Sequence, residues 1–204
     1  MSQFEYLVTF TSIIAGLGVV DLAQSFRELV RPRRPVRWHW LPLLWAVITF
    51  YFVVQIWWNG YQLLQESTAN YFVMYLLTYL LLYLVCAFAL PDPEWSQAQD
   101  EARSRDESNP RNEVLDLEAF YFSGSHRRWY FGVFSGCVFI GEMGFQINEV
   151  LNGSGPRLES AAWSGGVAAL LALLIATDRW WVHVVGSGAL FLLSMWSVLG
   201  PLLA

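Results

Sequence analysis

Six runs of about 20 apolar residues constrain most strongly what this chain can fold into. About 30 Å of hydrocarbon is crossed at ~1.5 Å per helical residue, so each run is long enough for one transmembrane helix. The runs are solidly apolar and lack the alternation of membrane β-strands. We therefore predict an all-α polytopic membrane protein, one domain over residues 1–204 with spans at Tyr6–Gln24, Leu41–Gln62, Tyr71–Leu90, Trp129–Val150, Ala161–Thr177 and Trp180–Leu202.

The composition agrees with a membrane protein, because 55% of the residues are hydrophobic and only 14% are charged. The 12 basic residues, all arginine, are outnumbered by 17 acidic ones. This balance excludes the basic face of a nucleic-acid-binding protein. Cys86 and Cys137 lie in separate apolar runs, which is typical of core thiols and excludes a disulfide framework or a cysteine metal site.

The distribution of arginine predicts the orientation, because basic loops stay on the cytoplasmic side. Only Arg157 falls on the other side of the predicted spans. Both termini are therefore expected to be periplasmic. The first span lacks a basic start and contains Asp21, which favours a retained helix over a signal peptide. The arginines expected inside are Arg27, Arg31, Arg33, Arg34, Arg37, Arg103, Arg105, Arg111, Arg127, Arg128 and Arg179.

One long polar segment, at about residues 91–126, separates the third and fourth spans. Its first part is acidic and rich in proline, which predicts a flexible cytoplasmic loop. After it, Val114, Leu117 and Phe120 or Tyr121 recur at helical intervals and predict an amphipathic helix at the inner interface. This helix would either dock a protein partner or simply lead into the fourth span.

An Arg-Trp pair opens each even-numbered span, at Arg37-Trp38, Arg128-Trp129 and Arg179-Trp180. The pattern suggests three helical hairpins. Ordinary anchoring in the headgroup layer explains the same pairs without a repeat.

The fourth span carries the most costly polar residue. Glu142 lies 14 residues after Arg128, which is ~21 Å along a helix and within the outer half of the membrane. Gln146 and Glu149 follow on the same helix face. An ionisable group at this depth is a candidate functional site, because its insertion costs ~2.5–3.5 kcal/mol.

The second span has a matching polar stripe that includes Gln55 and Asn59 at a similar depth. Together with Glu5 at the outer end of the first span, the two stripes would line an acidic vestibule that favours cations or protons. Alternatively, the amides only bond neighbouring helices.

Two further patterns favour helix packing. Tyr71, Tyr75, Tyr79 and Tyr83 form one stripe on the third span, which predicts an aromatic seam or, alternatively, a proton or water path. Gly132 and Gly136 in the fourth span have the GxxxG spacing of a close-approach surface.

The sequence contains no motif of a common enzyme or cofactor site. His39, His126 and His183 fall at similar depths near the inner ends of the even spans, so a three-histidine metal site is conceivable. Their spacing is not a ligand motif, and we expect these histidines to lie at the membrane interface without binding a metal. We therefore expect no enzyme, no metal and no cofactor.

Four segments in the first two-thirds of the chain, TSIIAGLGVVDLAQSFRELVR, VRWHWLPLLWAVITFYFVVQIWW, DLEAFYF and HRRWYFG, resemble a group of small, uncharacterised bacterial multi-pass membrane proteins. That group has no established activity, so the resemblance implies a bacterial inner-membrane location and no site residue.

The polar stripes lead to two functional hypotheses. The first is a small channel or transporter for a cation or proton. The second is a non-catalytic structural or regulatory subunit that docks a partner through its cytoplasmic loop. The expected partners are the lipid bilayer, another copy of the chain in a homo-oligomer, or a protein at the loop.

Overall fold

The computed structural model describes residues 3–31, 35–65, 69–91 and 114–203. Within these ranges the chain is helical apart from two strands of two residues each and short connecting segments, which confirms the all-helical prediction. Each predicted span overlaps one of six long helices. In chain order the elements are α1 (Gln3–Val30), β1 (Val36–Arg37), α2 (Trp40–Gln65), α3 (Ala69–Ala89), β2 (Leu115–Asp116), α5 (Leu117–Phe122), α6 (Gly124–Leu151), α7 (Leu158–Ala176) and α8 (Trp180–Leu203).

Four of these helices, α1, α2, α6 and α7, are long and apolar enough to cross a membrane. In α3 and α8 the apolar segments with described side chains are shorter, at Val73–Ala89 and Trp180–Met195. Part of the predicted acidic loop, residues 92–113, lies outside the described residues.

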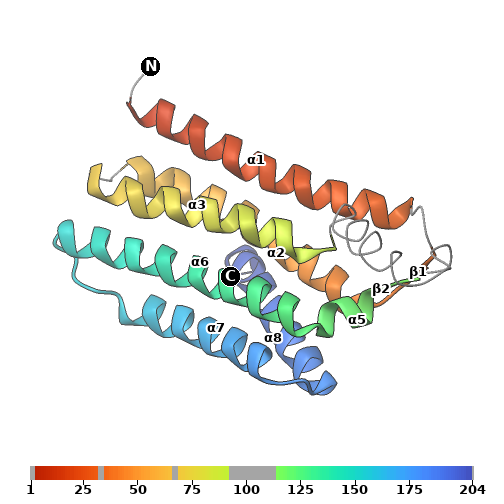
Figure 1. Ribbon diagram of the computed structural model, residues 1–204. Coiled ribbons are helices and arrows are strands. Elements are labelled where there is room, and N and C mark those ends of the chain that lie inside the picture. Colours follow the sequence, from red (N-terminus) through yellow and green to blue (C-terminus); the bar gives the residue numbers. More distant parts are fainter. Residues whose placement is uncertain (1–2, 32–34, 66–68, 92–113, 204) are drawn as a thin grey trace.

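The helices form two layers (Figure 1). α1, α3, α6 and α7 lie side by side in the front layer, each packed against the next. α2 and α8 lie behind them, with α2 packed against both α1 and α3. In the front layer α1 and α3 are separated in the chain by α2, whereas α6 and α7 are consecutive. The packing therefore does not confirm an arrangement of three helical hairpins.

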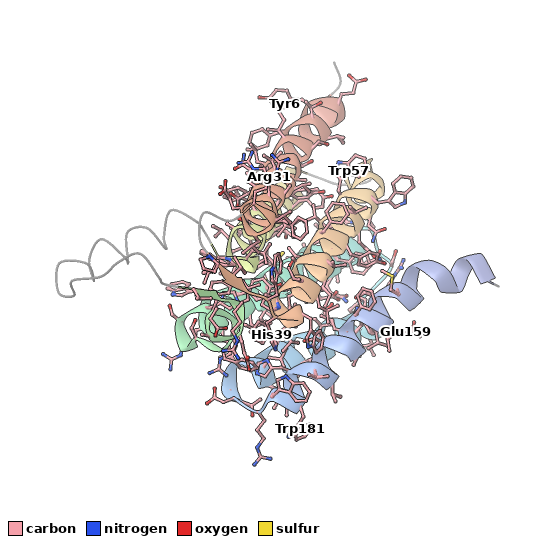
Figure 2. All side chains as sticks on the ribbon, turned by 90° about the vertical axis from the view of Figure 1, so that its right-hand side faces the viewer. Tyr6, Arg31, His39, Trp57, Glu159 and Trp181 are labelled. Carbon is pink, nitrogen blue, oxygen red and sulfur yellow. The ribbon has the colours of Figure 1, made fainter. Side chains whose placement is uncertain are left out.

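α8 differs from the other long helices in its direction. Figure 2 shows that it starts beside the bundle, near Trp181, and that its C-terminal half projects away from the other helices. It packs against α2 and α7 over limited regions.

The end of the bundle that faces the viewer in Figure 2 carries the small elements. β1 and β2 pair in parallel, with Val36 opposite Leu115 and Arg37 opposite Asp116. Asp116 then caps α5 by accepting hydrogen bonds from the backbone N–H groups of Glu118 (2.9 Å) and Ala119 (3.1 Å). The predicted amphipathic helix therefore begins at Leu117 instead of Val114, because the residues before it are extended in the strand pair.

The core near this end is aromatic. Trp45 of α2 is almost fully buried and makes edge contacts with Tyr130, Phe131 and Phe134 of α6, at centroid distances of 5.7, 4.9 and 6.1 Å. Such contacts add to the burial of large apolar surfaces. α2 and α6 are thus joined by aromatic packing in their N-terminal halves.

Among the described residues of this single chain, Gly132 is not a point of close approach, because a Cβ atom built there would meet nothing within 4 Å. At Gly136 the nearest atom, on Leu81, would be 3.9 Å away, which is ordinary contact. A close approach occurs instead at Gly60 of α2, where a Cβ would lie 1.2 Å from the Tyr75 hydroxyl oxygen. GxxxG spacing did not identify it, because the neighbour is a tyrosine side chain and not a helix backbone.

Candidate functional site

The polar stripe of α6 faces the first turns of α7. Glu142 Oε1 accepts hydrogen bonds from the Ser160 hydroxyl (2.5 Å) and from Gln146 Nε2 (2.6 Å). Glu142 Oε2 accepts a third, from the Ser164 hydroxyl (2.7 Å). All three donors are neutral, and two of them come from α7, so the carboxylate fastens α6 to α7.

Gln146 is held in one orientation by the residue that precedes α7. The backbone N–H of Arg157 donates to Gln146 Oε1, and the Arg157 carbonyl accepts from Gln146 Nε2, both at 2.9 Å. This two-point pairing identifies the amide oxygen and nitrogen and directs an N–H group toward Glu142.

Glu149 completes the stripe through an ion pair. Its Oε2 lies 2.9 Å from Arg157 Nε. The Glu149 side chain is 11% exposed and that of Arg157 is 62% exposed. The Arg157 guanidinium also lies over the Phe145 ring, 5.6 Å from its centroid. Each predicted residue of the α6 stripe is therefore engaged by α7 or its first flanking residue.

The other predicted vestibule residues have different surroundings. On α2, Tyr51 donates to the Ser194 carbonyl of α8 (2.8 Å), Gln55 is partly buried with an unbonded Oε1, and Asn59 is exposed. Glu5 is exposed in the first turn of α1, which forms the opposite edge of the front layer from α7 (Figure 1). The structure thus brings together Glu142, Gln146 and Glu149 but does not gather Glu5 with them.

The tyrosine stripe of α3 divides into buried and exposed parts. Tyr75 and Tyr79 are buried, and their hydroxyl oxygens lie 3.1 Å apart. Tyr79 also donates to the Ile56 carbonyl of α2 (3.4 Å). Tyr83 is 36% exposed, and the Tyr71 side chain lies outside the described set. The hydroxyl contact described for this stripe thus joins Tyr75 and Tyr79.

A second polar network, which the sequence did not predict, is buried at the end that carries α5. Trp45 Nε1–H donates to the Tyr121 hydroxyl oxygen (3.0 Å), and the same hydroxyl lies 3.0 Å from His183 Nδ1. His183 Nε2 lies 2.9 Å from the Thr177 carbonyl oxygen. Burial raises the pKa of Tyr121 above its ordinary value, so the phenol keeps its proton. The network joins α2, α5 and α8.

Arg127 of α6 closes this network from the other side. Its Nη1 donates to the same Thr177 carbonyl (2.5 Å), and its Nη2 pairs with Asp178. The Arg127 side chain is only 10% exposed, whereas that of Asp178 is 84% exposed. This contact holds the start of α6 against the turn between α7 and α8.

The three histidines lie in three different environments. His183 is fully buried in the bundle. His126 stacks on Tyr130 at 5.4 Å, and His39 Nδ1 accepts from the Leu41 N–H. Among the described residues, no group of three or more His, Cys, Asp or Glu side chains is placed to hold a metal ion.

No protein-family model, no curated protein and no solved structure matches this chain. The inferences about its function therefore rest on its own residues.

Proposed function

We propose that the chain is a six-span protein of the bacterial inner membrane with both termini in the periplasm. The four long apolar helices support this proposal, and α3 and α8 would complete the set of six spans. The arginine distribution supports the orientation. The end of the bundle that carries α5 includes Arg37, Arg127 and Arg179. This clustering is expected if that end faces the cytoplasm.

Within that membrane, we propose a non-catalytic structural or regulatory subunit. The observation that carries this proposal is that the acidic stripe of α6 is occupied by α7. Glu142 accepts three hydrogen bonds, and Glu149 is paired with Arg157. Carboxylates bonded in this way join helices. The partner would be a protein bound at the cytoplasmic end, or a second copy of the chain in a homo-oligomer.

A specific observation also favours the second candidate, a channel or transporter for a cation or proton. Each hydrogen bond that Glu142 accepts comes from a neutral donor. The Ser164 hydroxyl can rotate and accept a hydrogen bond from protonated Glu142, so the carboxyl group can be protonated without losing its partners.

Substitution of Glu142 separates the two functions. Glu142→Gln removes the titratable charge but keeps one oxygen for Ser160 and Gln146 and places an amide N–H toward Ser164, which can accept it. Glu142→Leu leaves all three donors without their acceptor. A subunit should show no cation or proton flux in proteoliposomes, a nearly unchanged melting temperature for Glu142→Gln and a lowered one for Glu142→Leu.

Ion flux by the wild-type protein that Glu142→Gln abolishes would contradict the subunit and establish the transporter. Ser164→Ala is a matched control, because it removes one hydrogen bond and keeps the charge. In a transporter it should retain more flux than Glu142→Gln.

A further inference from the structure

α5 is held in the bundle through Tyr121. The helix has only six residues, so its stability depends on packing and not on its own hydrogen bonds. Tyr121 is fully buried, and its hydroxyl is shared between Trp45 of α2 and His183 of α8. This hydroxyl is therefore the polar anchor of α5.

The contacts of His183 show where its proton lies. A carbonyl oxygen can only accept, so the 2.9 Å contact with Thr177 requires the proton on Nε2. In the neutral ring, Nδ1 is then the acceptor, and Tyr121 donates to it. The hydrogen bonds therefore form a chain from the Trp45 N–H group to the Tyr121 hydroxyl, then to His183 and to the Thr177 carbonyl. Each donor in this chain faces an acceptor.

We propose that His183 is a proton-binding site that controls how firmly α5 is held in the bundle. A proton added at Nδ1 turns the acceptor of the Tyr121 hydroxyl into a donor. Trp45 and His183 then both direct N–H groups at the Tyr121 oxygen, and the tyrosine hydroxyl can no longer donate to His183. A buried charge is also created, which is favourable only if the ring gains access to water. Acidification therefore loosens α5.

The neighbouring groups do not compensate for this charge. From α6, the Arg127 guanidinium shares the Thr177 carbonyl with His183 and repels an imidazolium. Asp178 attracts it but is exposed and already paired with Arg127. The ring of His126 lies 6.2 Å from that of Tyr121, and α2 contributes the neutral Trp45.

Ser187 of α8 offers a second position for the Tyr121 proton. Its buried hydroxyl faces Tyr121 but has no hydrogen bond of normal geometry. It can accept a hydrogen bond from the Tyr121 hydroxyl once His183 is charged, so the Tyr121 O–H group has two possible orientations. Because Ser187 is neutral, it does not offset the buried positive charge.

This inference goes beyond the proposed subunit function, because it concerns α5 alone. The proposed function would matter only if the loosening of α5 controlled a partner bound at the cytoplasmic end. The experiment measures α5 directly, so its result does not depend on ion flux or on a partner.

Amide hydrogen exchange of the full-length protein in detergent tests the proposal. Protection of residues 117–122 is compared at about pH 8 and about pH 5, with each rate divided by the intrinsic chemical rate at that pH. We expect acidification to reduce the protection of α5 at least about tenfold, the scale of one buried charge that lacks a compensating partner. Protection of α7 over residues 168–176 should change little. Equal protection of α5 at both pH values overturns the proposal.

Two histidine variants identify the responsible ring. His183→Asn keeps an oxygen that can accept from Tyr121 but cannot take up a proton, so α5 should no longer respond to pH. His126→Asn is the matched control, because His126 also lies beside Tyr121 but is not bonded to its hydroxyl, and it should respond like the wild type. If α5 in His183→Asn still loosens on acidification, or if His126→Asn removes the response, the proposal is wrong.

Discussion

The two polar networks of this protein differ in how they are built. At one end, Glu142, Gln146 and Glu149 lie on one face of α6 and bond to residues at most 22 positions away. At the other, Tyr121 joins Trp45 and His183, which are 76 and 62 positions from it. The first network joins two consecutive helices, whereas the second joins several elements.

They also differ in their contact with the surroundings. Arg157 in the α6–α7 network is 62% exposed, so solvent or lipid headgroups can replace part of its interactions. Trp45, Tyr121 and His183 are buried. Substitutions in the α5 network should therefore cost more stability than those in the α6–α7 network, because nothing replaces a lost partner there.

Reporter fusions test the sides of the membrane on which the two networks lie, with an all-or-none readout. Reporters at the C-terminus and near Arg157 should be periplasmic, and one near Arg105 should be cytoplasmic. A cytoplasmic C-terminus, with the other two reporters as expected, would show that the number of spans after Arg157 is odd. The inclined α8 would then be the first helix to re-examine.

Trp45→Ala should cause the largest loss of stability. It removes a buried indole that packs on three aromatic rings and donates to Tyr121, which costs about 3–5 kcal/mol. Trp58→Ala is the matched control on the same helix, because Trp58 is 67% exposed. Thermal unfolding in mild detergent measures both variants. Similar melting temperatures would show that the aromatic core near α5 does not stabilise the bundle.

Gln146→Leu and Gln55→Leu compare the two predicted polar stripes directly. Gln146 bonds to Glu142 and to both backbone groups of Arg157, so its loss should cost about 1–3 kcal/mol. Gln55 has a buried oxygen without a partner, so leucine there should be neutral or stabilising. If Gln55→Leu is the more damaging variant in thermal unfolding, α2 has polar contacts that outweigh those of α6.

The sequence predicted the helices well because their signal is local. A run of about 20 apolar residues identifies a span without knowledge of its neighbours. The same holds for the α6 stripe, since Glu142, Gln146 and Glu149 share a face by helical periodicity alone. The partner of this stripe, α7, was not predicted. Ser160 and Ser164 also share a face, but the predicted span began at Ala161 and left Ser160 out.

The α5 network was not predicted because nothing local distinguishes its members. Tyr121 lies in a short aromatic segment, and His183 follows two tryptophans, a typical interfacial pattern. Their meeting depends on the direction of α8 and on the strand pair that positions α5, both of which are tertiary features. The same holds for Gly60, whose neighbour Tyr75 belongs to another helix.

The smallest predicted effect concerns the strand pair that precedes α5. Folding holds the pKa of Asp116 below its ordinary value of 3.8. The largest cause is the hydrogen bond from the backbone N–H of Ala119; the backbone N–H of Glu118 and Arg37, whose Nη1 lies 3.0 Å from Asp116 Oδ2, act in the same direction, and the slight burial of the carboxyl group opposes them. A carboxyl group whose pKa is lowered by folding stabilises the fold when ionised. Its contribution is complete at neutral pH and is lost as the pH falls through 3.8 and then through the folded value. The stability difference between wild type and Asp116→Asn should therefore be constant near neutrality and shrink below about pH 4. A difference that persists at lower pH would mean that Asp116 acts through packing and not through charge, and that β2 positions α5 without the help of Arg37.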